Sequence, residues 1–308
     1  MSVEVQNLTK TFGAQKAVDA ISFSAKHGEI LGFLGPNGAG KSTTMKIATC
    51  YLPPTNGQVK VAGLDVVDEP LEVRKRVGYL PEHNPLYLEM FVHEYLGFIG
   101  SLHGLTGLGL KSRAAEMIAL CGLTAEQNKK IGQLSKGYRQ RVGLAQAMIH
   151  DPEVLILDEP TSGLDPNQIT EIRNVIKQIS TEKTVIFSTH IMQEVQALCD
   201  RVVIINKGSI VADSKVADLK STSDHDVIKL EFKAAINTEP LMALEAIQNL
   251  EELAEGLYKI KVQKDADLRS EIFGLASQHN WPLVGLNQEE GSLEEIFRQL
   301  TQKEEVEV

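Results

Sequence analysis

One short stretch of this sequence constrains the fold more than any other, the glycine-rich run Gly35-Pro-Asn-Gly-Ala-Gly-Lys-Ser42. An apolar segment, 30–34, precedes it, and an apolar helical pattern over 43–50 follows it. Apolar residues on both faces are typical of a central strand in a parallel sheet, and the order strand, glycine loop, helix is that of a phosphate-binding loop. The chain is therefore expected to contain an α/β domain built around this loop.

The residue types in this run suit the binding of nucleotide phosphates. Glycines let the backbone wrap tightly and point its N–H groups at phosphate oxygens, and the following helix adds the positive end of its dipole. Lys41 is expected to reach the β- and γ-phosphates, and Ser42 to bind Mg²⁺. The run supplies the nucleotide-binding candidates Gly35, Pro36, Asn37, Gly38, Ala39, Gly40, Lys41, Ser42 and Thr43.

A second apolar segment, 154–157, ends in two carboxylates, Asp158 and Glu159. Asp158 is the candidate Mg²⁺ ligand beside the phosphates, and Glu159 the candidate general base that orients or deprotonates the attacking water. An Asp-Glu pair after a strand is on its own more often a pair of solvated turn residues. The phosphate-binding loop upstream favours the catalytic interpretation.

The order of strand and helix patterns divides the 308 residues into two domains. Residues 1–220 alternate between strands and helices around a helical insertion at about 88–150, and a polar break at 220–225 follows. Residues 226–302 predict a small α/β accessory domain, and residues 303–308 an acidic tail. Within the accessory domain we expect strands at 227–232, 257–262 and 283–286 and helices at 239–250, 268–278 and 293–300.

The composition argues against several classes of function. The formal net charge of −10 gives no basic footprint for a nucleic acid. The three cysteines, Cys50, Cys121 and Cys199, lack metal-ligand spacing and predict small buried residues in a reducing compartment. The sequence starts without a signal-peptide pattern, and no apolar run approaches the ~20 residues that span a bilayer. We expect a cytoplasmic chain, with any membrane span supplied by another subunit.

Three further motifs make a family resemblance visible. Leu134-Ser-Lys-Gly-Tyr138, Leu155-Ile-Leu-Asp-Glu-Pro-Thr-Ser-Gly-Leu-Asp165 and Thr189-His190 follow the phosphate-binding loop in this order. The order resembles the signature, Walker B, D-loop and switch histidine of the ABC ATPases, and the resemblance covers about residues 1–215. It implies a P-loop NTPase fold of the ABC type, with a parallel sheet core, an antiparallel β subdomain and a helical insertion.

The resemblance also implies how the sites are assembled. Two subunits face head to tail, and each ATP with its Mg²⁺ lies between the phosphate-binding loop of one subunit and the signature loop of the other. Ser135, Lys136 and Gly137 would then contact the partner's nucleotide, and Asp165 would lie in the loop that crosses between subunits. Phe12 fits the aromatic that stacks on adenine, and His190 the γ-phosphate contact beside Lys41 and Glu159; taken alone, Phe12 would more often be a core or edge aromatic and His190 structural or merely exposed.

Two motifs depart from the family's common pattern. Glu82 stands where the family usually has Gln, and the signature reads Ser-Lys-Gly-Tyr instead of Ser-Gly-Gly-Gln. A carboxylate still binds Mg²⁺ or orients water, so the expected metal ligands are Ser42, Glu82 and Asp158. Lys136 places a positive charge near the partner's nucleotide, where it either binds phosphate or faces solvent.

These departures and the C-terminal extension resemble the branch that serves ABC-2-type exporters, most closely the ATP-binding subunits associated with bacterial gliding motility. The resemblance implies as partners a second ATPase subunit and polytopic membrane permeases, on the inner face of the plasma membrane. Phe91, Tyr95 and Phe98 either present an apolar face to a permease helix or form the insertion's own core. The alternative function is that of a soluble ABC switch ATPase acting on ribosomes or DNA without a transporter; no nucleic acid is expected.

Overall fold

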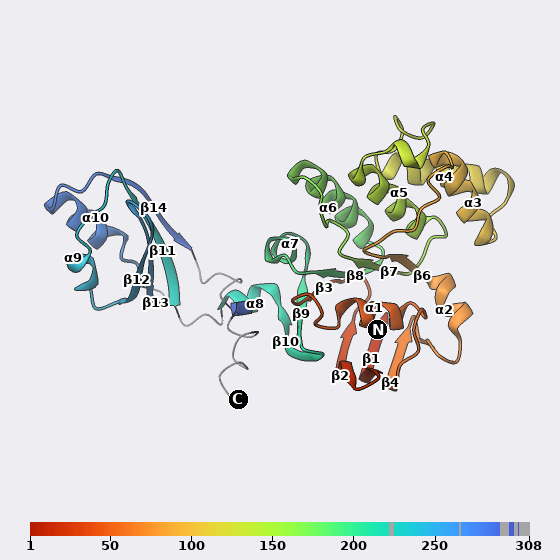
Figure 1. The fold of residues 1–308 in the computed structure, drawn as a ribbon, viewed down its shortest axis with the longest axis horizontal. Helices are drawn as coiled ribbons and strands as arrows, with labels where there is room; N and C mark the ends of the chain where they lie inside the picture. Colours follow the sequence, from red (N-terminus) through yellow and green to blue (C-terminus); the bar gives the residue numbers. More distant parts are fainter. Residues whose placement is uncertain (222–224, 265, 290–295, 299–300, 302–308) are drawn as a thin grey trace. The chain divides into compact units, whose positions relative to one another are not determined.

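The computed structural model describes the chain apart from residues 222–224, 265, 290–295, 299–300 and 302–308, so the acidic tail expected at 303–308 lies outside the described residues. Contacts divide the chain into two compact units, Met1–Ser214 and Lys215–Val308. Both units are visible in Figure 1. The division falls before helix α8 (Val216–Ser221), whereas the polar break predicted a boundary at 220.

The first unit begins with an antiparallel sheet of the order β2-β1-β4-β5. Its long strands carry alternating apolar residues, so one face is buried against the rest of the unit. Val3, Val5 and Leu8 of β1 are at most 2% exposed. The strands are β1 (Val3–Phe12), β2 (Gln15–Ala25), β4 (Asn56–Val61) and β5 (Leu64–Asp65).

A second sheet, of the order β10-β9-β3-β8-β7-β6, forms the centre of this unit. Strands β9, β3, β8, β7 and β6 run parallel, and β3 and β7 are buried along their whole length. The strands are β3 (Ile30–Leu34), β6 (Val77–Leu80), β7 (Val154–Asp158), β8 (Thr184–Thr189), β9 (Arg201–Asn206) and β10 (Ser209–Lys215). In parallel sheets, ligands bind at the carboxyl ends of the strands.

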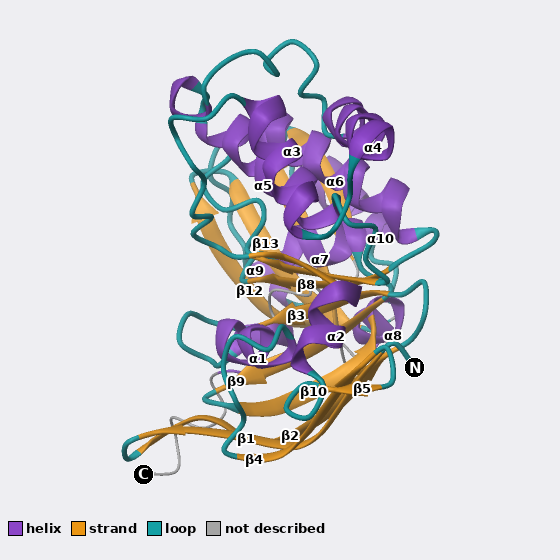
Figure 2. Cartoon of the chain, turned by 90° about the vertical axis from the view of Figure 1, so that its right-hand side faces the viewer, coloured by secondary structure: helices purple, strands orange, loops and turns teal. Residues whose placement is uncertain are grey.

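Helices cover both faces of the parallel sheet. Helix α1 (Lys41–Ala48) contacts β4 and β7 and lies between the two sheets, while α6 (Pro166–Ser180) and α7 (Met192–Leu198) pack on the opposite face (Figure 2). The helical insertion packs against β6 through α5. The remaining helices of this unit are α2 (Pro70–Arg76), α3 (Val92–Leu102), α4 (Gly107–Leu120), the short 3₁₀ helix Ile131–Gln133 and α5 (Lys136–Met148).

The second unit contains an antiparallel sheet of the order β12-β13-β11-β14, against which helices α9 and α10 pack. Its core includes Ile228, Leu230, Ile260 and Ile272, all 0% exposed. The elements are β11 (His225–Phe232), α9 (Glu239–Met242), β12 (Ile247–Ala254), β13 (Leu257–Gln263), α10 (Arg269–Gln278) and β14 (Leu283–Glu289).

The helix predicted at 239–250 is wrong. Helix α9 ends at Met242, and β12 takes the second half of the expected helix. The apolar spacing that suggested a helix has another cause: the register of β12 on β13 shifts between Ile247 and Asn249. This irregularity lets Ile247 and Leu250, three residues apart, both pack on the core. Most of the helix expected at 293–300 lies outside the described residues.

No helix in the described part of the chain has the length and apolarity that a bilayer crossing requires.

Candidate functional site

The carboxyl ends of three adjacent parallel strands meet at one edge of the central sheet. The pairing places Asp158 of β7 beside Ser188 of β8, and Leu34 of β3 beside Thr189. The glycine loop starts directly after Leu34, and Glu159 and His190 directly follow the other two strands. The sheet therefore brings the glycine loop next to two motifs that lie more than a hundred residues further along the chain.

Gly40 shows why the loop needs glycine. It ends the loop with a φ of +108°, and a Cβ there would lie 2.5 Å from the carbonyl oxygen of Ala17. Only glycine accepts both the left-handed backbone and this close approach. Helix α1 begins at the next residue, so the first N–H groups of the helix face the loop. The glycine loop and the start of α1 therefore fit phosphate groups.

Lys41 is held inside the loop by backbone carbonyls. Its Nζ donates to the carbonyl oxygens of Gly35, at 2.8 Å, and Pro36, at 3.2 Å, and the residue is 5% exposed. The same Nζ lies 3.4 Å from Oε1 of Glu159. A buried ammonium needs anionic or carbonyl partners, and a phosphate placed in the loop would supply them.

Glu159 links Lys41 to the switch histidine. Its Oε2 lies 2.8 Å from Nδ1 of His190, and its Oε1 is buried but accepts no hydrogen bond within the described residues. The residue is 6% exposed and adopts a φ of +50°, a conformation uncommon outside glycine. A buried carboxylate oxygen with free acceptor capacity is the group that a water molecule would bind.

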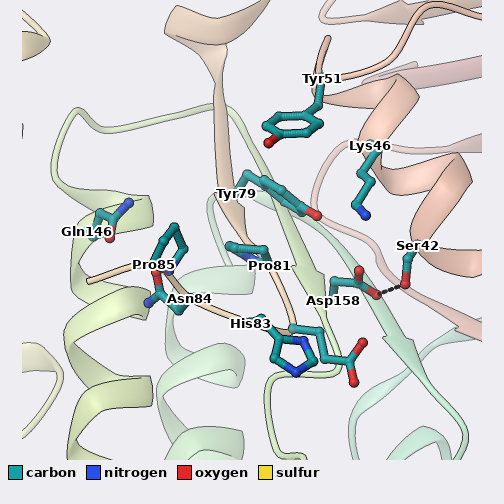
Figure 3. A pocket seen from close by; sticks show the side chains of 11 residues that line it. Ser42, Lys46, Tyr51, Tyr79, Pro81, His83, Asn84, Pro85, Gln146 and Asp158 are labelled. Carbon is teal, nitrogen blue, oxygen red and sulfur yellow. Dashed lines mark hydrogen bonds between the residues drawn. The ribbon is translucent and has the colours of Figure 1, made fainter. Parts of the chain in front are cut away.

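The side chains beside the loop suit a hard cation. Ser42 Oγ donates to Oδ1 of Asp158 at 3.1 Å (Figure 3), and Ser188 Oγ donates to the same oxygen at 2.5 Å. Glu82 lines the same cavities as Ser42. Hydroxyl and carboxylate oxygens are the ligands that Mg²⁺ prefers, so the donor set fits the metal expected from the sequence.

Much of the predicted set meets in one cavity of about 270 Å³. Its lining is Asn37, Gly38, Lys41, Ser42, Glu82, Glu159, Ser162 and His190. An adjoining cavity of about 390 Å³ opens between Ser42, Asp158 and the segment around Glu82. Figure 3 shows Lys46 and Tyr79 directed into it.

The remaining predicted residues do not line the first cavity. Ser135 begins α5, its Oγ accepting from the N–H of Tyr138 at 3.4 Å, and Asp165 begins α6, its Oδ1 accepting from the N–H of Gln168 at 3.0 Å. The two loops touch: Lys136 Nζ lies against Gly163, and Gly137 packs on the Gln168 side chain. Phe12 lies at the end of β1, 48% exposed, with Lys10 Nζ 5.2 Å from its ring centroid.

Sequence reasoning missed three polar residues near this edge. Ser162 lines the cavity, and Ser188 holds Asp158 and also accepts from the N–H of Glu159 at 3.1 Å. A serine directly after the apolar run 185–187 of β8 was the available signal. The hydroxyl of Tyr79 is buried without a partner in the described part of the chain; burial, and then the negative charge of Asp158, raises the pKa of Tyr79.

A family model and the curated relatives point to the same protein family. The family model of ABC transporters matches residues 18–162. The linearmycin resistance ATP-binding protein LnrL of Bacillus subtilis is 35% identical over 97% of this chain and 98% of its own length. The bacitracin transport ATP-binding protein BcrA of Bacillus licheniformis is 32% identical over 97% of this chain and 96% of its own. Both alignments extend into the second unit.

Solved structures agree with these relatives. The dimeric ATP-binding cassette MJ0796, bound to ADP and Pi in a post-hydrolysis state, has a TM-score of 0.65 and 26% identity, covering 70% of this chain and 98% of its own. An ATP-binding subunit of an ABC transporter has a TM-score of 0.66 and 28% identity, covering 72% and 92%. The fold, the cavity and the two full-length relatives together show that this chain belongs to the ABC transporter family as an ATP-binding, ATP-hydrolysing subunit.

Proposed function

We propose that two copies of this chain, or this chain and a homologous subunit, close head to tail around two ATP–Mg²⁺ and drive a separate ABC-2-type exporter. One observation carries the dimer. The cavity holds Lys41, Glu159 and His190, while Ser135, Lys136 and Gly137 line no part of it and are held at the start of α5. A second subunit would bring its helix N-terminus and its signature loop to the open side of the cavity.

Each residue of the cavity has a proposed task. Lys41 and the N–H groups after Gly40 bind the β- and γ-phosphates, and Ser42 and Asp158, with Glu82, hold Mg²⁺, which polarises the phosphoryl oxygens when bound. Glu159 accepts the proton of the attacking water at its Oε1, which accepts no hydrogen bond from the described residues, and His190 contacts the γ-phosphate. Phe12 stacks on the adenine, its exposed ring being accessible to a base.

The variant Glu159→Gln tests the head-to-tail dimer. It keeps the phosphate contacts but removes the base, so hydrolysis should fall by about a hundredfold or more and a dimer should accumulate with ATP and Mg²⁺. Size-exclusion chromatography with light scattering measures the dimer. Glu182→Gln, which changes an exposed glutamate two residues after α6, serves as the charge-matched control. A Glu159→Gln protein that stays monomeric with ATP and Mg²⁺ would overturn the proposed head-to-tail dimer.

An aromatic surface on the insertion supports a membrane partner. Tyr87, Phe91 and Phe98 are 56%, 36% and 37% exposed, and the Tyr87 and Phe98 rings lie 5.8 Å apart. Tyr95 belongs to the insertion's core, because it is 3% exposed and its hydroxyl donates to Gln146 Oε1 at 2.7 Å. We propose that a helix of the permease packs on this surface from the inner face of the membrane.

Affinity purification from the native membrane tests the exporter. Recovery of a polytopic membrane protein with the wild type, and its loss with Phe98→Ser, would support the proposal. Ribosomal or DNA-repair proteins in place of a permease would favour the soluble switch ATPase, which no observation on the structure supports. The names of LnrL and BcrA refer to linearmycin resistance and bacitracin transport, which favours export of a compound of this kind; the proposed link to gliding motility rests on the sequence resemblance alone.

A further inference from the structure

A glutamate outside the cavity is buried without a cation. Glu194, in the first turn of α7, is 1% exposed. Among the described residues, no lysine, arginine or histidine lies within ion-pair distance of its carboxylate. Burying a carboxylate is unfavourable unless hydrogen bonds replace its water. The partners that replace water at Glu194 are two hydroxyl groups.

One hydroxyl comes from the segment that follows β7, and the other from the last residue of β8. Thr161 Oγ1 donates to Oε1 of Glu194, and Thr189 Oγ1 donates to Oε2 at 2.6 Å. Both threonines are at most 2% exposed. Thr161 lies two residues after Glu159, and Thr189 directly precedes His190. The carboxylate of Glu194 therefore bridges the segment that carries the proposed base and the segment that carries the switch histidine.

The Thr189 hydroxyl that contacts Glu194 also fixes the backbone conformation around His190. The N–H of Ile191 donates to Oγ1 of Thr189 at 3.0 Å, so the chain is fixed on both sides of the histidine. The histidine side chain itself is 45% exposed, and its contact with Glu159 at 2.8 Å depends on where its backbone lies. Glu159, with its φ of +50°, likewise needs surrounding contacts to keep an unfavourable conformation.

We propose that Glu194 is a positioning residue for ATP hydrolysis: through Thr161 and Thr189 it holds Glu159 and His190 at their working separation. It acts through these neighbours, because neither Glu194 nor the two threonines line the cavity. A carboxylate suits this role, since its two oxygens accept one hydroxyl hydrogen each. A glutamine accepts at one position only and would turn an amide N–H group toward the other hydroxyl.

The inference rests on the proposed roles of Glu159 and His190, and the experiment separates the two. The full chain is purified as wild type, Glu194→Gln, Glu159→Gln and Gln196→Ala, the last being an exposed position on the same helix. Initial rates of ATP hydrolysis give kcat and KM, and equilibrium titration with ATP and Mg²⁺ gives the Kd. Glu194→Gln should lower kcat by about a hundredfold, the loss expected when a catalytic group is misplaced by about 1 Å, with Kd within about threefold.

The threonines supply a readout that a merely structural role would not move. Thr161→Val and Thr189→Val should each lower kcat, whereas Thr161→Ser and Thr189→Ser, which keep the hydroxyl, should restore most of it. Wild-type kcat in Glu194→Gln with a dead Glu159→Gln would overturn the inference alone, as would equal losses in valine and serine variants. Wild-type hydrolysis in Glu159→Gln would overturn the proposed base and the inference with it.

Discussion

Lys41 and Glu159 form a buried ion pair, and we propose that both members act on the nucleotide. Their side chains are 6% and 7% exposed, with 3.4 Å between Nζ and Oε1. Breaking such a pair is costlier than removing it entirely, because the remaining charge stays buried without its partner. His190, 45% exposed at its side chain, touches the same carboxylate and gives it a second, solvent-accessible partner.

A double-mutant cycle on this pair should show coupling. Lys41→Met leaves the Glu159 carboxylate without its ammonium partner, so the nucleotide-free protein should lose about 2–4 kcal/mol of unfolding free energy. Lys41→Met with Glu159→Gln should recover part of that loss, giving a coupling of about 1–3 kcal/mol. Urea unfolding followed by circular dichroism measures all four proteins. Simple additivity of the two changes would contradict the ion pair as an energetic unit.

Within the insertion, two glycines of α3 have different surroundings. A Cβ at Gly97 meets nothing within 4 Å, whereas a Cβ at Gly100 would lie against the side chain of Leu110 and 3.3 Å from that of Ile149. Gly97 therefore serves no packing requirement, while Gly100 is where α4 and the end of α5 approach α3. The same residue type has opposite consequences three positions apart.

Alanine substitutions should separate these two roles. Gly97→Ala should stabilise the first unit by about 0.5–1 kcal/mol, because alanine loses less backbone entropy in a helix. Gly100→Ala should destabilise it by about 1–3 kcal/mol through overpacking against Leu110 and Ile149. Thermal unfolding of the two variants in parallel provides the comparison. A stabilised Gly100→Ala protein would show that the helices shift apart at little cost.

A stacked histidine pair joins the end of α3 to the end of α5. The ring centroids of His103 and His150 lie 3.9 Å apart, and the angle between the ring planes is 6°. His150 Nε2 lies 3.1 Å from the carbonyl oxygen of Val77. Burial, and then His103, lowers the pKa of His150 to about 4; Arg113 adds to this and Asp151 opposes it. The folded state therefore keeps His150 neutral where an unfolded chain would protonate it.

This pair makes stability depend on pH in a known direction. Below the unfolded pKa of about 6.5 the unfolded chain binds a proton that the folded chain does not, so stability is lost as pH falls toward 4. The free energy of unfolding of wild type relative to His150→Gln should therefore drop by roughly 1–2 kcal/mol between pH 7.5 and 4.5, after allowance for solvent screening. Urea titrations at the two values measure it. A difference independent of pH would rule out this titration.

The single tryptophan of this chain lies in the second unit, so its fluorescence reports the unfolding of that unit separately. The ring of this residue, Trp281, meets Phe232 edge-on with 6.0 Å between centroids and stacks on His279 at 4.8 Å. The cavity proposed to bind the nucleotide, in contrast, is lined entirely by residues of the first unit. The hydrophobic clusters of the two units share no residue.

Nucleotide should therefore stabilise one unit and leave the other unchanged. With ATP and Mg²⁺ at about a hundredfold Kd, linkage adds about 2.7 kcal/mol to the first unit, so the circular dichroism transition should move to higher temperature. Tryptophan fluorescence, which reports the second unit, should keep its midpoint. A hydrolysis-deficient Glu159→Gln protein keeps the ligand intact during the scan. Equal shifts in both signals would mean that the units unfold together.

The sequence by itself determined the short motifs of this protein and the strands and helices next to them. A glycine loop between an apolar strand and a helix, and the Asp158-Glu159 pair after another strand, are short-range patterns whose chemistry holds wherever the strands lie. The strands expected at 30–34 and 154–157 and the helical insertion followed from apolar patterns of the same kind. Each of these signals is contained within a few consecutive residues.

The tertiary structure alone decided which distant residues meet. Ser188 reaches Asp158 because β7 and β8 pair in one particular register, and Thr161 reaches Glu194 because a loop packs on a helix. Tyr95 is buried and its neighbour Phe98 exposed because α5 covers one side of α3. A shifted register turned the apolar spacing of Ile247 and Leu250 from an apparent helix into a strand. Packing over long sequence separations sets such contacts, and no local pattern contains that information.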